Sequence, residues 1–562
     1  MMVKTPSSVV TPAVATKLNP VEVRVKRADR RDGWDLASKV LFVLLAVLIL
    51  ATFMDYGVTW DEPVQHFYGG TIVRYYISLL HGHFDKGALN AGDLIYYGGF
   101  FDTVAVAING ISPLGRYETR HLLNALIGLI GIIGCWRVGR LLGGSAAGFW
   151  AAALLVLTPR YYGQMFNNPK DVPFAVGYIW AMYYLLRALP HLPRVPRNIT
   201  VKLGIAIGLA LGVRVGGLLL LAYVLLVAGL YGIFSARSKA AFAGLVKFAL
   251  TVIGIAWAIM LVCWPWAQMQ PLTRPFEALS HVTRFPWFGA VLFEGQSIPA
   301  VHEPRIYILR WLSISLPEIV LLLAGAGLLC AVVLLFRKST YTLVKNHYWM
   351  LLSFATLFPL LYVIAVRPIL YDADRHFVYV VLPLVCLCGL VLARGLEWAH
   401  STSRLVWAAG LVAIAGYSVW QVSVMVRLHP DEYVYFNQTI GGLQGAAGKF
   451  ETDYWGNSYK EAVKDLVKYL QTNEPQGRHT VMAASRPEST SYFLPSWITF
   501  TKNPEQADFV ISTTRYGIDQ ILDGPVLLTV KRLGVPLAVV KDRRQLKGVP
   551  VPGWPPVLAV SE

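Results

Sequence analysis

The sequence predicts a polytopic α-helical membrane protein with a small α/β domain at its C-terminal end. Of its 562 residues, 55% are hydrophobic and only 15% are charged, whereas soluble proteins usually carry about 25% charged residues. The apolar residues gather in runs close to the roughly 20 residues that a helix needs to cross a bilayer. Basic residues gather between these runs, and the chain after Arg427 has a mixed, more ordinary composition.

The same composition argues against several other classes of protein. The apolar content is too high for a chain that is mainly disordered. The five cysteines are too few for a secreted disulfide scaffold, and all fall within apolar runs, which is typical of small packing residues: Cys135, Cys263, Cys330, Cys386 and Cys388. The formal net charge of +17 would fit a nucleic-acid partner, but the positions of the basic residues give it another meaning.

About eleven membrane spans are expected. The apolar run Val201–Phe234 is too long for one straight helix and contains Arg214 among glycines, so we interpret it as two helices that meet at Arg214. The other nine expected spans are Leu36–Met54, His121–Leu142, Ala146–Thr158, Asp171–Ala188, Phe242–Trp264, Ser315–Phe336, His347–Val366, Phe377–Ala393 and Leu405–Val426.

The basic residues alternate along the chain as the positive-inside rule requires. The N-terminal tail is basic, and so is every second loop: Arg137–Ser145, Arg187–Lys202, Ser235–Lys247, Arg337–Asn346 and Arg394–Arg404. We therefore expect a cytoplasmic tail (residues 1–35), a membrane domain (36–426) with a large first outer loop (55–120), and a periplasmic α/β domain (427–562). The charge of +17 then orients the protein in the membrane, and no nucleic-acid partner is expected.

The C-terminal domain is expected to alternate short helices and strands. Ser458–Gln471 has the pattern of an amphipathic helix, and Ser458 with Glu461 has the spacing of a capping box. Five short strands are expected: Thr480–Ala484, Trp497–Thr501, Asp508–Thr513, Val526–Val530 and Leu537–Val540. The two halves of the chain show no sequence repeat, so an inverted-repeat transporter gains no support.

The residues with chemical potential lie on the expected outer side. Asp61 and Glu62 follow the first span and precede Val64–Leu80, an aromatic amphipathic segment suited to the membrane interface. Adjacent helical residues point about 100° apart, so only one of the two carboxylates can easily face a given pocket. Asp61 could act in catalysis, or it could cap the helix that follows, with Pro63 in its first turn.

Further charged residues flank the later outer spans. Lys170 and Asp171 stand side by side at the start of the fourth span, where Asp171 could also cap the helix. Arg214 lies at the helix break, and Arg375 and His376 lie in the segment before the span at Phe377. Charged groups at membrane depth are costly and often mark substrate pathways. No His/Cys cluster has metal-ligand spacing, but carboxylates could hold a divalent cation.

The sequence contains no phosphate-binding loop of the soluble nucleotide-binding kinds. An outer-facing site has no access to cytoplasmic nucleotides, so an activated substrate would have to come from the membrane as a lipid-linked phosphate.

These motifs, in this order, resemble the GT-C glycosyltransferases, especially bacterial family 39, akin to protein O-mannosyltransferases and the lipid A aminoarabinose transferase. The resemblance covers roughly Ser38–Arg427. Its best matches are Trp60-Asp61-Glu62-Pro63, Asn168-Pro169-Lys170-Asp171-Val172-Pro173, and Tyr371-Asp372 through Arg375-His376-Phe377. The Lys-Pro-Pro motif of aminoarabinose transferases is missing from the first outer loop, which argues against an aminoarabinose donor.

The resemblance implies an inverting glycosyltransferase of a bacterial inner membrane. The donor would be a polyprenyl-phosphate sugar, and the acceptor would be a hydroxyl of a glycan, a lipid or a protein. Asp61 would be the catalytic base, with Glu62 beside it and Asp171 as a further acidic residue. The donor phosphate would be bound by Lys170, Arg214, Arg375 and His376. A transporter or flippase of lipid-linked sugars is the main alternative, and a membrane scaffold is a third.

Overall fold

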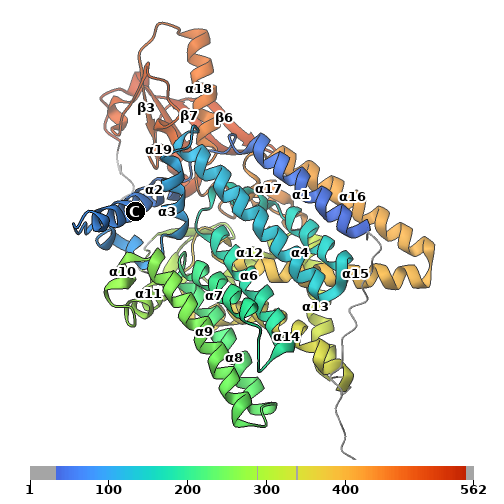
Figure 1. Ribbon diagram of the computed structural model, residues 1–562. Helices are drawn as coiled ribbons and strands as arrows, with labels where there is room; N and C mark the ends of the chain where they lie inside the picture. Colours follow the sequence, from blue (N-terminus) through green and yellow to red (C-terminus); the bar gives the residue numbers. More distant parts are fainter. Residues whose placement is uncertain (1–32, 286, 288, 337–339, 552–562) are drawn as a thin grey trace, which may run out of the picture.

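The computed structural model describes residues 33–285, 287, 289–336 and 340–551 (Figure 1). It confirms the predicted fold class, because a bundle of long helices carries a small sheet domain built from the C-terminal part of the chain. The predicted cytoplasmic tail is described only from Gly33 onward, and the predicted basic loop at 337–346 lies partly outside the described residues.

Eight helices in the described parts of the chain are long and apolar enough to cross a membrane. They are α1 (Gly33–Thr52), α4 (Arg116–Val156), α6 (Asp171–Ala188), α8 (Leu218–Phe234), α9 (Lys239–Cys263), α14 (Thr340–Val366), α15 (Val378–Thr402) and α16 (Arg404–Leu428). Two shorter helices, α7 (Arg197–Leu211) and α13 (Glu318–Phe336), occupy further predicted spans. Helices therefore form at all eleven predicted positions once α4 is recognised as two spans.

The two spans within α4 double back on each other at Gly144. This glycine has φ 85° and ψ −171°, which is far from helical. A Cβ on Gly148 would lie 2.8 Å from the backbone oxygen of Trp136, twelve residues earlier. In a straight helix these residues would be about 18 Å apart, because each residue advances 1.5 Å. The two arms match the predicted spans on either side of Ser145.

The break predicted at Arg214 is also present. Arg214 is extended, with φ −137° and ψ 137°, between α7 and α8. Residues from alternate predicted loops lie at opposite ends of the bundle. Arg140, between the arms of α4, pairs with Asp35 at the start of α1. Asp61, Lys170, Arg214 and Arg375 gather at the opposite end, which lies beneath the C-terminal domain (Figure 1).

Short elements connect the long helices, and except for η3, which joins α6 to α7 at the opposite end, they lie toward the end that holds these charges. They are α2 (Asp61–Leu80), η1 (Gly87–Leu89), η2 (Gly92–Tyr96), α3 (Phe100–Asn109), α5 (Pro159–Asn167), η3 (Leu189–His191), η4 (Val215–Gly217), α10 (Pro265–Met269), α11 (Arg274–Thr283), η5 (Ala300–His302), α12 (Tyr307–Ser315), η6 (Arg375–Phe377), η7 (Glu432–Val434), η8 (Gln438–Ile440) and α17 (Gly442–Ala446). The hairpin of β1 (Ala290–Phe293) and β2 (Gln296–Pro299) was not predicted.

The C-terminal domain packs α18 (Tyr459–Asn473) against a five-stranded sheet of order β4-β3-β5-β7-β6. Its strands are β3 (His479–Ala483), β4 (Ile498–Phe500), β5 (Phe509–Thr513), β6 (Val526–Arg532) and β7 (Val535–Asp542), close to the predicted ranges. Strands β4, β3 and β5 are parallel, whereas β7 runs antiparallel to β5 and β6. Short helices α19 (Glu488–Ser491), η9 (Pro504–Gln506), η10 (Arg515–Gly517), α20 (Ile518–Ile521) and η11 (Arg544–Leu546) complete the domain.

The predicted capping box of α18 does not form. Ser458 has helical backbone angles and caps no amide with its side chain. Its hydroxyl donates to Asp453, and Glu461 pairs instead with Arg532 of β6. Tertiary partners thus replace the local hydrogen bonds that the sequence pattern favoured.

We expect the contact between α15 and α4 to be sensitive to one methyl group. A Cβ on Gly389 would lie 2.4 Å from the backbone nitrogen of Ala151, and backbone cannot yield easily. Gly389→Ala should therefore lower the thermal unfolding temperature of the purified protein, with a cost of about 1–3 kcal/mol for overpacking.

Gly395 on the same helix is the matched control, because a Cβ there meets nothing within 4 Å. Gly395→Ala should leave the unfolding temperature unchanged or raise it, since alanine favours helix by about 1 kcal/mol over glycine. Equal losses in both variants would contradict this packing.

Candidate functional site

Asp61 is joined to Arg375 at the end of the bundle beneath the C-terminal domain. The Arg375 Nη1 atom donates to Asp61 Oδ2 over 2.5 Å. Asp61 is the first residue of α2, but it does not cap the helix, because Trp60 occupies the capping position and no side-chain capping bond is made. One-third of the Asp61 side chain (33%) stays exposed, so the carboxylate is accessible.

Arg375 is buried and held from several directions. Its Nη2 atom lies 3.0 Å from Asp372 Oδ2, and its guanidinium packs over the rings of Tyr371 and Trp455 at 5.1 and 5.2 Å. Asp372 in turn accepts a hydrogen bond from Arg515 of the C-terminal domain. Four charged side chains therefore form one continuous chain of ion pairs from the start of α2 to the C-terminal domain.

The segment that carries Arg375 is anchored to the membrane domain by Asp374. Arg160 Nη1 and Ser315 Oγ each donate to the Asp374 carboxylate over 2.8 Å. His376, which follows Arg375, is half-buried, and its ring centre lies 4.9 Å from that of Tyr371 with the two ring planes at 82°.

A second group of charges surrounds Tyr97. The Lys170 ammonium lies 4.3 Å from the centre of the Tyr97 ring, and the Arg214 guanidinium lies 5.7 Å from it. Arg214 also pairs with Asp171 over 2.6 Å. Asn168 fixes Asp171, since its side chain accepts from the Asp171 amide and donates to the Asp171 carboxylate, each over 3.0 Å. Among the described residues, no carboxylate lies within ion-pairing distance of Lys170.

The electrostatic field of these groups favours an anion. Burial acts to raise the pKa of Asp61, but the guanidinium of Arg375 and the ammonium of Lys170 outweigh it and lower that pKa to about 2. Burial lowers the pKa of Lys170, although nearby Asp61 opposes the shift. Four cations, Lys170, Arg214, Arg375 and Arg515, lie among four carboxylates, Asp61, Asp171, Asp372 and Glu451, the last of which is 3.8 Å from Arg515.

Glu62 lies outside this site, and the catalytic role predicted for it is not supported. Its carboxylate is almost fully buried, accepts from the backbone and hydroxyl of Thr59 at 2.9 and 3.1 Å, and lies 3.0 Å from His121 Nε2. These contacts tie Glu62 back to Thr59, just before the capping residue Trp60, and give it a structural role at the start of α2. The spacing Thr59-x-x-Glu62 was the sequence signal for this structural role.

Three side chains of the site were not predicted from the sequence. Tyr97 lies between α2 and α3 with no motif around it, and Trp455 and Arg515 come from the C-terminal domain. Tyr371 and Asp372, by contrast, stood within a recognised motif. No group of three or more His, Cys, Asp or Glu side chains in the described ranges has the geometry to hold a metal ion. A divalent cation at the carboxylates stays a prediction.

Part of the chain is similar to a known protein family. Residues 118–266 match the family model described as dolichyl-phosphate-mannose-protein mannosyltransferase. This match confirms the resemblance to membrane glycosyltransferases. It also supports the predicted enzyme class, glycosyltransferase. The matched segment contains Lys170, Asp171 and Arg214, whereas Asp61 and Arg375 lie on either side of it.

Two solved structures are similar in fold. The structure of ArnT from Cupriavidus metallidurans bound to undecaprenyl phosphate has 15% sequence identity and a TM-score of 0.48, and the likeness covers 90% of this chain and 98% of that one. The oligosaccharyltransferase AglB from Archaeoglobus fulgidus, in complex with an inhibitory peptide and a dolichol-phosphate, has 13% identity and a TM-score of 0.49, covering 87% and 71%. No curated protein sequence matches the chain.

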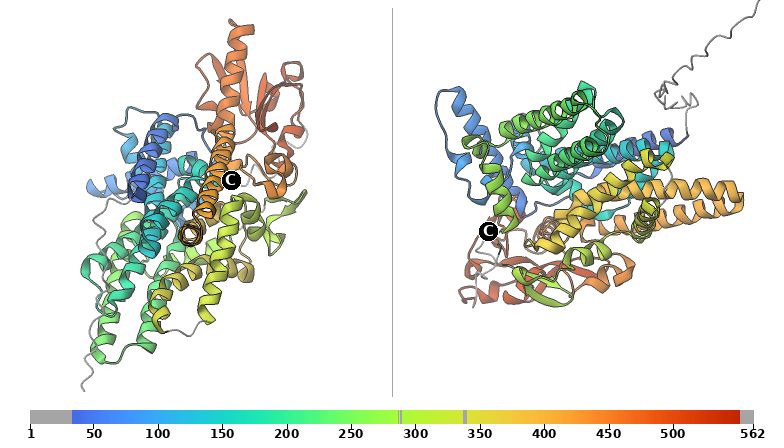
Figure 2. Two further views of the ribbon diagram at one scale, coloured as in Figure 1. Left: turned by 90° about the vertical axis from the view of Figure 1, so that its right-hand side faces the viewer. Right: turned by 90° about the horizontal axis from the view of Figure 1, so that it is seen from below.

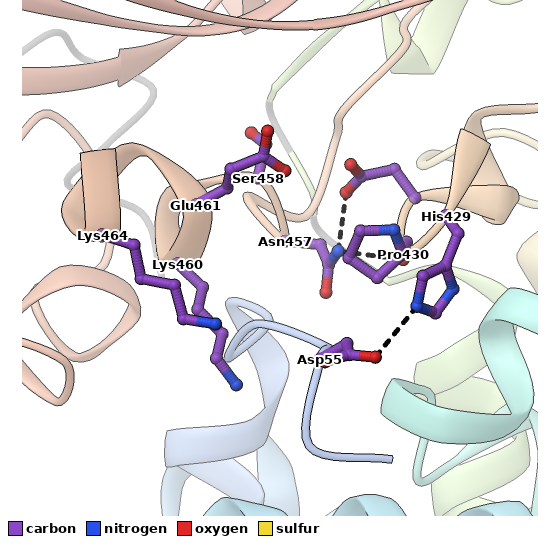
Figure 3. A pocket seen from close by; sticks show the side chains of 9 residues that line it. Asp55, His429, Pro430, Asn457, Ser458, Lys460, Glu461 and Lys464 are labelled. Atoms are coloured by element: carbon purple, nitrogen blue, oxygen red, sulfur yellow. Dashed lines mark hydrogen bonds and ion pairs between the residues drawn. The ribbon is translucent and has the colours of Figure 1, made fainter. Parts of the chain in front are cut away.

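A separate cavity of about 200 Å³ lies where the end of α1 meets α18 (Figure 3). On one side Lys460 donates to the backbone oxygens of Met54 and Tyr56. On the other side, His429 Nε2 pairs with Asp55 at 3.1 Å (Figure 3). The other ring nitrogen of His429, Nδ1, lies 2.8 Å from Glu432, so His429 bridges the two carboxylates. The His429–Asp55 pair at this cavity is a second ionic contact between the C-terminal domain and the membrane domain.

The His429 bridge predicts a pH-dependent stability. Burial acts to lower the pKa of His429, but Glu432 and Asp55 outweigh it and raise that pKa to about 9. A raised pKa stabilises the fold fully below the ordinary value of about 6.5, and this stabilisation is lost as the pH rises through 9. We expect a contribution on the order of 2 kcal/mol, because exposure of Asp55 weakens the pairing.

The unfolding temperature of the wild-type protein should therefore fall between pH 7 and pH 10 more steeply than that of His429→Gln. The control is His83→Gln, at an exposed histidine of the first outer loop. If His429→Gln and the wild type had parallel pH profiles, the bridge would not contribute to stability.

Proposed function

We propose that the protein transfers a sugar from a polyprenyl-phosphate donor to an acceptor hydroxyl, with inversion, on the outer face of a bacterial inner membrane. The observation that carries the proposal is the direct pairing of the accessible carboxylate Asp61 with Arg375, beside Lys170 and Arg214. A carboxylate suited to the role of base and three cations suited to binding an anion thereby lie together near the ends of the long apolar helices.

The cations suit one lipid phosphate. Lys170 has an aromatic contact but no paired carboxylate among the described residues, so a phosphate can add to it without displacing a partner. Arg214 is held in place by Asp171, whose role in the proposal is to orient this guanidinium. Arg375 supplies a planar fork suited to phosphate oxygens, and His376 flanks it. These groups would stabilise the charge that develops on the leaving phosphate.

The donor itself would activate the base. A carboxylate with a pKa of about 2 is a weak base while it is paired with Arg375 and close to Lys170. A donor phosphate would compete for the same cations, and its negative charge would raise the pKa of Asp61. Asp61 would therefore become an effective base only when a donor is bound.

The chemical step then follows in one displacement. The acceptor oxygen attacks the anomeric carbon from the face opposite the phosphate, while Asp61 accepts the hydroxyl proton. The bond between the anomeric carbon and the phosphate oxygen breaks, and its electron pair stays with the polyprenyl phosphate. The acceptor hydroxyl belongs to a glycan, a lipid or a protein.

Transfer from a radiolabelled polyprenyl-phosphate sugar tests these roles. Asp61→Asn keeps the shape of the side chain but removes the base, so kcat should fall about 10²–10⁴-fold, the usual contribution of general-base catalysis. Lys170→Met should instead raise the donor KM by about tenfold or more, because it removes an unpaired cation from the phosphate site.

Asp93→Asn is the control, since Asp93 is an exposed carboxylate of the same outer loop. It should leave both parameters near the wild-type values. Unchanged transfer by Asp61→Asn would exclude Asp61 as the base. Movement of the lipid-linked sugar across proteoliposomes without cleavage of the sugar-phosphate bond would favour the transporter instead.

A further inference from the structure

Arg515 extends from the C-terminal domain into the site of the membrane domain. It is almost fully buried, with a side-chain exposure of 2%. Its Nη1 atom donates to the backbone oxygen of Tyr454 over 2.6 Å, and its Nη2 atom donates to Asp372 Oδ1. The guanidinium also packs over the Trp60 ring at 4.8 Å. Arg515 thus contacts both segments that position the Asp61–Arg375 pair.

The segment before α18 adds backbone contacts to the same region. The Trp60 amide donates to the Trp455 oxygen over 3.2 Å, and the Gly57 amide donates to the Asn457 side chain over 2.8 Å. The Asn457 side chain also accepts from Asn167, close to Lys170 in sequence, over 3.0 Å. The C-terminal domain therefore fixes the approaches to both the base and the phosphate site.

The residues at the Arg515–Asp372 contact have unusual backbone conformations. Asp372 and Ala373 have φ of 56° and 64°, and Tyr516 has φ 57°. Such left-handed angles are uncommon for residues other than glycine, and they persist where surrounding contacts enforce them. Strain of this kind is concentrated at functional sites, and here it occurs on both sides of one ion pair.

We propose that Arg515 is a positioning residue of the donor site, which controls through Asp372 how Arg375 is shared between Asp61 and the donor phosphate. This inference rests on the proposed function, because it assumes that Arg375 binds the phosphate. It assigns the C-terminal domain a role in donor binding.

Asp372 pairs with two guanidinium groups, one through each carboxylate oxygen. Oδ1 accepts from Arg515 and Oδ2 pairs with Arg375, so each guanidinium neutralises part of one carboxylate. Without Arg515, both oxygens become available to Arg375, and a carboxylate binds a guanidinium best in a bidentate pair. Arg375 would then be drawn toward Asp372, away from Asp61 and from the phosphate. Donor binding would weaken, and the pKa of Asp61 would rise.

Binding of undecaprenyl phosphate to the purified full-length protein tests the proposal without requiring the natural sugar. We expect Arg515→Gln to weaken binding about tenfold. Arg515→Lys should recover part of the loss, because lysine keeps the charge but lacks the planar fork. Arg543→Gln is the control, since Arg543 is equally buried in the same domain and donates to the Asp523 backbone oxygen.

The decisive comparison repeats Arg515→Gln in the Asp372→Asn background. If Arg515 acts through Asp372, the second substitution should change binding less than twofold there, because interacting residues are non-additive. A direct effect of the Arg515 charge on the phosphate, or general damage to the domain, would persist in that background. The acid limb of the transfer pH profile should also move to higher pH in Arg515→Gln.

Wild-type affinity in Arg515→Gln, or an equal loss in both backgrounds, would overturn the proposal. Should Arg515→Gln fail to fold, Arg515→Lys serves instead, and wild-type affinity in that variant would overturn it equally. Failure of the wild-type protein to bind undecaprenyl phosphate would instead contradict the proposed function, and the inference would fall with it.

Discussion

The burial of the Arg375 guanidinium is the constraint on which the end of the helix bundle beside the C-terminal domain depends. A buried charge is costly unless it is paired and hydrogen-bonded. Arg375 meets this requirement with two carboxylates, Asp61 and Asp372, and with the faces of two aromatic rings. These partners come from the start of α2, the segment before α15 and the C-terminal domain, so three distant parts of the chain must converge.

The convergence makes the C-terminal domain part of the site. Arg515 neutralises Asp372, and the segment before α18 binds the backbone of the loop that leads to Asp61. The domain also contacts the end of α1 through Lys460 and His429 (Figure 3). Figure 2 shows the sheet domain at one end of the bundle, with the long helices extending away from it. Without a donor, the Asp61–Arg375 pair neutralises itself, and in the proposed mechanism a phosphate must compete for it.

The sequence predicted the helices well because their signals are local. Long apolar runs identified the spans, and Arg214 among glycines identified the break between α7 and α8. Capping was harder to predict. Ser458 and Glu461 form no capping box because Arg532 binds Glu461, whereas Glu62, at the same spacing from Thr59, accepts a hydrogen bond from the Thr59 amide. The same local sequence pattern therefore gives different hydrogen bonds when tertiary partners compete for the side chains.

The candidate site was predictable only in part for the same reason. Asp61, Lys170, Asp171, Arg214 and Arg375 stood out as charges at the ends of apolar runs, and the structure brings them together. Arg515 could not be inferred, because its pairing with Asp372 joins residues 143 positions apart and no periodicity records such a contact. The carboxylate of Glu62, next to Asp61 in sequence, instead binds Thr59 and His121, and its predicted catalytic role stays a prediction.

The central claim is that a lipid phosphate takes over the cations that hold Asp61. Infrared titration of the purified protein measures it most directly, with the carboxyl band of Asp61 identified by its loss in Asp61→Asn. The account predicts a pKa of about 2 without lipid and a clear upward shift when undecaprenyl phosphate is added. An unchanged pKa in the presence of bound undecaprenyl phosphate would contradict it.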